Sequence, residues 1–149
     1  MNRLRIPDSI SAMVYRMGWP WTLMVWGIAA CGFAAMMSVD GLPDYMYGIG
    51  FAASACVAFV GAMPLVPGSH NTLHWSFGIA ACVLSQLWTV LACVIIGSGW
   101  QALAIVLLSV VAAAYFTGTL RRSWCFWLEL WCIAAVAVVR VVIYKGIDI

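Results

Sequence analysis

Five apolar runs limit what this chain can fold into. They cover most of the 149 residues and lie near residues 19–38, 46–63, 74–96, 100–118 and 124–144. A helix needs about 20 mostly apolar residues to cross the roughly 30 Å hydrocarbon layer of a membrane. Backbone groups in that layer must be hydrogen-bonded within the chain, which favours helices. The pattern therefore predicts an all-α integral membrane protein with a five-transmembrane-helix bundle.

The composition agrees with a lipid environment. The chain is 66% hydrophobic and 8% charged, whereas soluble domains carry roughly 25% charged residues. A small water-soluble fold could not hide this much apolar surface. The net charge of +2, without a Lys/Arg run or a glycine-rich phosphate loop, excludes nucleic acid as an expected partner. The first run shows no small-residue cleavage pattern, so we expect a retained span and not a signal peptide.

Residues 1–18 are predicted to be an interfacial amphipathic segment, separate from a single membrane domain at 19–149. Asp8 or Ser9 can cap a short helix after Pro7. Apolar residues then recur at helical spacing, at Ile10, Met13, Val14 and Met17. With arginines around this apolar stripe, the helix would lie along the membrane surface. A frayed basic tail is the alternative.

Small residues concentrate in the second run. They are Gly48, Gly50, Ala52, Ala53, Ser54, Ala55, Ala58 and Gly61. Small side chains let helices approach closely when no hydrophobic force drives them together. We therefore expect this helix to be central to the bundle.

The six cysteines stand singly inside the apolar runs, at Cys31, Cys56, Cys82, Cys93, Cys125 and Cys132. No Cys-x-x-Cys pair occurs among them. Buried thiols at such positions behave as small hydrophobic groups. We expect packing roles for them and neither disulfides nor metal ligation.

The distribution of basic residues predicts the orientation. Five arginines fall on the side of the N-terminus, at Arg3, Arg5, Arg16, Arg121 and Arg122. The other side holds Lys145, Arg140 at its edge, and the acidic residues Asp40 and Asp44. Basic residues favour the cytoplasmic side. We expect a multi-pass protein of a bacterial plasma (inner) membrane, with the N-terminus cytoplasmic and the C-terminus on the opposite side.

Glu129 is the only formal charge well inside an apolar run. A charge at the centre of a membrane helix costs about 2.5–3.5 kcal/mol on insertion scales, and less near an interface. Glu129 lies one to two turns from the cytoplasmic end of its run. It could pair with Arg121 or Arg122, stay protonated, or face a partner helix.

His70 and His74 suggest a metal site under one helix register. If the third helix starts at Ser69, the two histidines share a face and could bind a metal, with Glu129 as third ligand. If Asn71 is the N-cap, His70 falls outside the helix. Histidines bonded to headgroups, water or loop carbonyls are the commoner alternative. Apart from such a metal, no cofactor is expected.

Two further positions complete the candidate residues. Gln86 lies mid-span with Ser85 and Thr89 nearby, where an amide serves either as a link between helices or as a ligand contact. Tyr115 is expected at the same polar level as His74. Among the tryptophans, Trp19, Trp21 and Trp75 suit a membrane interface, and Trp26, Trp88 and Trp131 lie deeper and are expected to pack between helices.

The central stretch also resembles a known group. It reads Val60-Gly61-Ala62-Met63-Pro64, then Leu73-His74, Gly78-Ile79-Ala80 and Ser85-Gln86-Leu87-Trp88. This pattern resembles small bacterial polytopic membrane proteins with a Gly-Ala-x-Pro helix end and a histidine opening the next span. These are distantly similar to membrane proteins that remodel glycosylphosphatidylinositol lipids. The likeness covers about 30 of the 149 residues and implies that His74 and Gln86 matter.

Three functions fit these observations. The first is a non-enzymatic protein that binds a lipid, a small apolar ligand or a membrane partner through a polar layer near the cytoplasmic face, at His74, Gln86, Glu129 and Tyr115. The second is metal-assisted lipid hydrolysis, with His70 and His74 as ligands and Glu129 as ligand or general base. The third is a small transporter component. Expected partners are membrane lipids and a second copy or another membrane protein.

Overall fold

The computed structural model describes residues 10–63, 71–119 and 124–147, and these form helices and turns without a strand. The elements are α1 (Ile10–Val14), the 3-10 turn η1 (Tyr15–Met17), α2 (Trp19–Met37), α3 (Asp44–Ala62), α4 (Thr72–Ile95), α5 (Gly99–Thr119) and α6 (Trp124–Ile147). The all-α fold class is confirmed. The bounds of the five long helices differ by only a few residues from those of the apolar runs.

Four of these helices are long and apolar enough to cross a membrane. They are α2, α3, α4 and the segment Cys125–Lys145 of α6. In α5 the apolar stretch within the described residues is shorter, Gln101–Tyr115. Length and composition therefore make the protein compatible with a multi-pass membrane protein.

Local sequence explains where the helices begin and end. Pro20 stands in the first turn of α2, where the missing N–H costs no hydrogen bond. Asn71 precedes α4, which is the register that leaves position 70 outside the helix. Gly97, with φ of 77°, ends α4, and the Ser98 N–H donates to the Cys93 carbonyl at 2.8 Å. A residue in the left-handed region and this backbone bond together close the helix and start the hairpin into α5.

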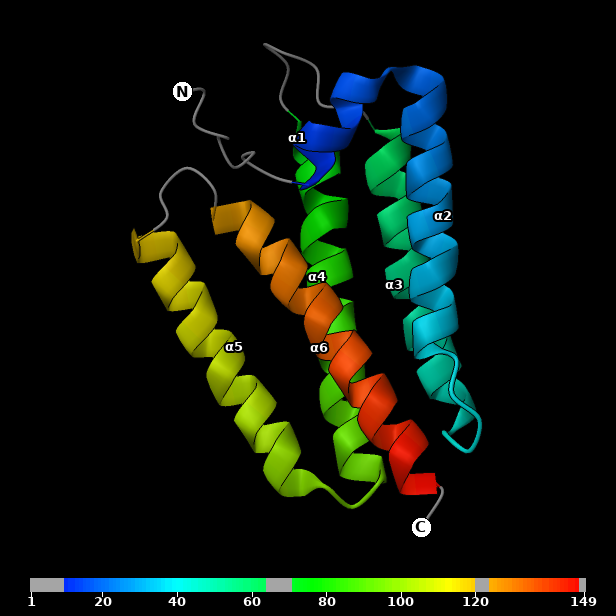
Figure 1. Ribbon diagram of the computed structural model, residues 1–149, viewed down its shortest axis with the longest axis vertical. Coiled ribbons are helices and arrows are strands. Elements are labelled where there is room, and N and C mark those ends of the chain that lie inside the picture. Colours follow the sequence, from blue (N-terminus) through cyan, green and yellow to red (C-terminus); the bar gives the residue numbers. More distant parts are fainter. Residues whose placement is uncertain (1–9, 64–70, 120–123, 148–149) are drawn as a thin grey trace.

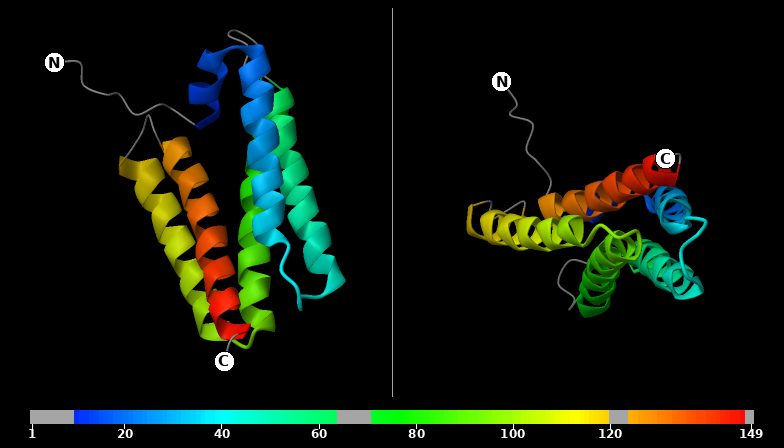
Figure 2. Two further views of the ribbon diagram at one scale, coloured as in Figure 1. Left: turned by 45° about the vertical axis from the view of Figure 1, so that its right-hand side comes forward. Right: turned by 90° about the horizontal axis from the view of Figure 1, so that it is seen from below.

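The helices form an up-and-down bundle (Figure 1). Within it, α4 contacts α3, α5 and α6, while α3 contacts α2 and α4. Seen from below, α5 lies at the outer edge beside α4 and α6 (Figure 2). The small residues of α3 predicted a central place for it, and α3 packs against both α2 and α4.

The small residues of α3 do allow a close approach to α2. Gly50 and Gly61 are buried, and a Cβ atom added to Gly61 would lie 2.3 Å from the Trp26 Cβ. A Cβ added to Gly50 would lie 2.9 Å from the Met37 Cβ. By contrast, nothing lies within 4 Å of a Cβ added to Gly48. Only one face of α3 therefore needs glycine.

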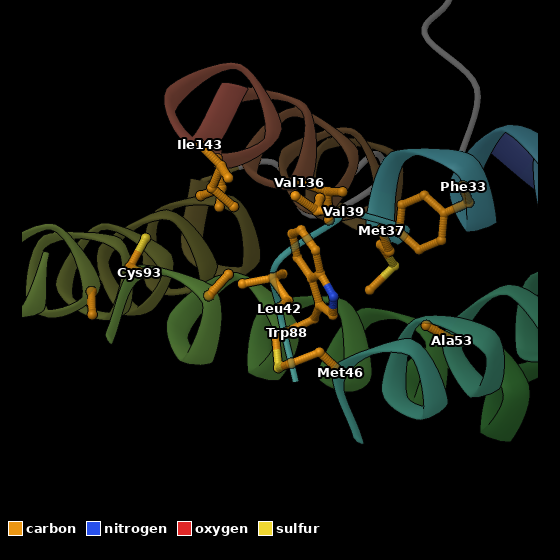
Figure 3. Packing of buried hydrophobic residues seen from close by; sticks show 13 residues of the cluster. Phe33, Met37, Val39, Leu42, Met46, Ala53, Trp88, Cys93, Val136 and Ile143 are labelled. Carbon is orange, nitrogen blue, oxygen red and sulfur yellow. The ribbon is translucent and has the colours of Figure 1, made fainter. Parts of the chain in front are cut away.

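The hydrophobic core lies around Trp88 of α4, which is fully buried (Figure 3). Its indole lies among side chains from α2, α3 and α6 and from the loop between α2 and α3: Met37, Leu42, Met46 and Val136. At the end of the bundle where α2 ends, the Arg140 Nη1 donates to the Ser38 carbonyl at 2.6 Å. Tyr47 donates to the Val39 carbonyl at 2.9 Å. Side chains thus bind the carbonyls that follow the end of α2.

Candidate functional site

The N-terminal strap, α1 with η1 (residues 10–17), lies at the end of the bundle where α2, α4 and α6 begin and α3 ends (Figure 1). Among the strap side chains that the structure describes, Ser11 and Val14 are buried, with exposed fractions of 1% and 5%. The predicted cap residues Asp8 and Ser9 lie outside the described residues. The strap thus buries a polar residue together with an apolar one, because it faces polar groups of three helices.

Glu129 of α6 binds the beginning of the strap. The Ile10 backbone N–H donates to the Glu129 Oε2 at 2.7 Å, and the Cys125 thiol lies 3.6 Å from the Oε1. The first N–H groups of a helix have no partner within the helix. A carboxylate there accepts a hydrogen bond and also interacts favourably with the positive end of the helix dipole. Glu129 therefore acts as an N-terminal cap for α1, supplied from another helix.

His74 of α4 binds the next strap residue. Its Nδ1 lies 2.8 Å from the Met63 carbonyl oxygen, and its Nε2 lies 3.2 Å from the Ser11 Oγ. A carbonyl oxygen can only accept, so Nδ1 carries the proton. In the neutral ring, Nε2 is then the acceptor for the Ser11 hydroxyl. Only 5% of His74 is exposed, and both ring nitrogens have partners.

Tyr15 joins the strap to the end of α3. Its hydroxyl donates to the Val60 carbonyl and lies 3.3 Å from the Met63 carbonyl. The last carbonyls of a helix have no partner within the helix, so Tyr15 and His74 together cap α3. Burial raises the pKa of the Tyr15 phenol from 10.0 to about 12. We call Ser11, Tyr15, His74 and Glu129 the strap node.

The structure brings His74 and Glu129 to the same end of the bundle, where they bind the consecutive strap residues Ser11 and Ile10. Tyr115 lies near the C-terminal end of α5 and is 57% exposed. His70, Arg121 and Arg122 lie outside the described residues. Pairing of Glu129 with either arginine therefore stays a prediction.

Gln86 belongs to a second polar group deeper in the bundle. The Ser109 hydroxyl donates to the Gln86 Oε1 at 3.0 Å, and the Trp131 indole N–H donates to the Ser109 Oγ at 3.0 Å. We call these three residues the Gln86 network. It links α4, α5 and α6, which is the first of the two roles predicted for Gln86. Gln86 follows His74 by 12 residues, or roughly 18 Å along α4. The predicted polar layer therefore divides into two groups.

The described residues give the metal hypothesis no further ligands. Within 10–63, 71–119 and 124–147, no three His, Cys, Asp or Glu side chains gather as a metal site would require. Both His74 nitrogens and both Glu129 oxygens already have protein partners. α4 starts at Thr72 with Asn71 at its N-cap position, and His70 lies outside the described residues, so the His70–His74 metal pair stays a prediction.

Ser11 and Tyr15 are the site residues that the sequence argument missed. The available signal was their spacing, because residues four apart share a helix face. They place two hydroxyl groups side by side, next to the apolar stripe of the N-terminal segment, which marks a face turned toward polar partners. Comparisons with protein-family models, curated proteins and solved structures find no match.

Proposed function

We propose that this chain is a five-span membrane protein with its N-terminus in the cytoplasm. The 21 residues of α5 support a fifth span, since about 1.5 Å per residue gives roughly 31 Å. The excess of arginine in the segments flanking the strap end supports this orientation in a plasma (inner) membrane. A reporter that is active on only one side of the membrane, fused after Ile149, tests the proposal. Activity outside the cytoplasm is expected, and activity inside contradicts it.

We further propose that the protein binds membrane lipid at the strap node and does so without catalysis. The observation that carries this proposal is the pairing of Glu129 and His74 with consecutive strap residues at one end of the bundle. Tryptophans at the start of α2 and of α4 support a membrane interface at this end, with exposed fractions of 52% for Trp19, 57% for Trp21 and 42% for Trp75. Polar groups at such a level lie within reach of lipid headgroups.

Native mass spectrometry of the purified protein with added phospholipid tests this function. We expect a retained lipid whose occupancy falls about tenfold in His74→Ala, the effect of roughly 1.4 kcal/mol. Thr117→Ala is the matched control, because among the described residues the Thr117 hydroxyl bonds to carbonyls of its own helix. Equal lipid occupancy in all three proteins contradicts the proposal. Turnover of a lipid that His74→Ala abolishes contradicts its non-catalytic part.

A further inference from the structure

Both side chains that hold the strap act as hydrogen-bond acceptors. Glu129 accepts the Ile10 N–H at 2.7 Å. In the neutral ring of His74, Nδ1 donates to the Met63 carbonyl and Nε2 accepts the Ser11 hydroxyl. No lysine or arginine belongs to the node among the described residues. The node therefore favours a ligand that donates hydrogen bonds, and the carboxylate of Glu129 disfavours a negatively charged ligand.

Glu129 and His74 bind adjacent residues of the strap, the Ile10 N–H and the Ser11 hydroxyl. A group with several N–H donors on a single atom can donate to more than one acceptor at once. A primary ammonium has three such donors and also supplies the charge that a carboxylate pairs with most strongly.

We infer that Glu129 and His74 form a binding site for the primary ammonium of an aminophospholipid headgroup, and that the strap occupies this site when the lipid is absent. The Ile10 N–H and the Ser11 hydroxyl then stand where the ammonium protons would be. This inference rests on the proposed lipid-binding function and adds the headgroup. It disfavours choline lipids, because a quaternary ammonium has no N–H to donate.

Competition between the strap and the lipid distinguishes this site from other lipid sites. Lipid and strap use the same two acceptors, so weakening the strap should strengthen lipid binding. Ser11→Ala removes one strap donor and leaves both acceptors in place. Glu129→Gln keeps the shape of the side chain and removes the charge that pairs with an ammonium.

The test measures lipid occupancy by native mass spectrometry for phosphatidylethanolamine, its N-methylated forms and phosphatidylcholine with matched acyl chains. For the unaltered protein we expect occupancy to fall with each methyl group, by about tenfold from the primary to the quaternary amine. Ser11→Ala should raise occupancy by phosphatidylethanolamine, and Glu129→Gln should remove the preference. Thr117→Ala should behave like the unaltered protein.

The possible failures are distinguishable. Equal occupancy by the ethanolamine and choline lipids, lost in His74→Ala, overturns the headgroup assignment and leaves lipid binding intact. Lipid occupancy that no variant changes overturns the proposed function as well. The last measurement replaces the lipid with soluble phosphoethanolamine. If this soluble amine is retained by the protein while the lipid is not, the ligand is a free amine and the lipid assignment is wrong. The methylation series needs no variant, so a folding defect in Glu129→Gln leaves the test decisive.

Discussion

At the residue scale, the polar side chains of the strap node satisfy helix ends. Glu129 accepts the first N–H of α1, while His74 and Tyr15 donate to carbonyls at the end of α3. A helix end without such partners is costly when water is scarce. The same residues can therefore stabilise the bundle and, once the strap is displaced, offer acceptors to a ligand.

Gly61 gives a prediction for packing. A Cβ at this position would lie 2.3 Å from the Trp26 Cβ, so Gly61→Ala must push the indole away or separate α2 from α3. Overpacking of this kind costs about 1–3 kcal/mol. We expect a loss of this size in the free energy of unfolding, measured by denaturant titration in detergent. Gly48→Ala, with open space around its Cβ, is the control and should show no loss.

Tyr15 gives a prediction for alkaline pH. Its pKa is raised in the folded protein from 10.0 to about 12, so the folded state holds the phenol proton more tightly than the unfolded state. The contribution of Tyr15 is fully present below pH 10 and is lost as the pH rises toward about 12. Stability measured across this range should fall less in Tyr15→Phe than in the unaltered protein. Parallel pH profiles would contradict the assignment.

At the scale of elements, the sequence predicts the long helices well and their partners poorly. The length of each apolar run predicts the bounds of α2 to α6 to within a few residues, and Asn71 lies at the N-cap position of α4. Which helices pack together depends on contacts between faces, so the glycines of α3 predicted a close approach but could not name α2 as the partner. The strap residues contact partners more than 60 residues away in the sequence, and no local sequence pattern predicts such contacts.

The Gln86 network gives a prediction for the attachment of α5. Ser109 of α5 bridges Gln86 and Trp131, so Ser109→Ala leaves an amide oxygen and an indole N–H without their partner. Hydrogen bonds between membrane helices contribute about 0.6 kcal/mol on average. Two lost bonds should lower the free energy of unfolding by about 1 kcal/mol. Thr117→Ala, on the same helix, should leave it unchanged, and equal losses in both variants would contradict a linking role.

At the scale of the whole molecule, the polar groups occupy distinct levels of an apolar bundle. The strap node lies at one end, the Gln86 network lies within, and Arg140 binds the loop after α2 at the other end. Between these levels the exposed side chains are mostly large and apolar, as expected for a surface that faces lipid. The central claim is that the strap is held in place across the node end by Glu129.

Amide hydrogen exchange at Ile10 tests this claim most directly, in the full protein reconstituted in lipid. The first N–H of a helix normally lacks a partner and exchanges freely, but here it donates to the Glu129 Oε2 at 2.7 Å. We predict a protected Ile10 amide whose exchange becomes about tenfold faster in Glu129→Ala, the loss of one charge-assisted hydrogen bond. Free exchange in the unaltered protein, or protection that Glu129→Ala does not change, would contradict the account.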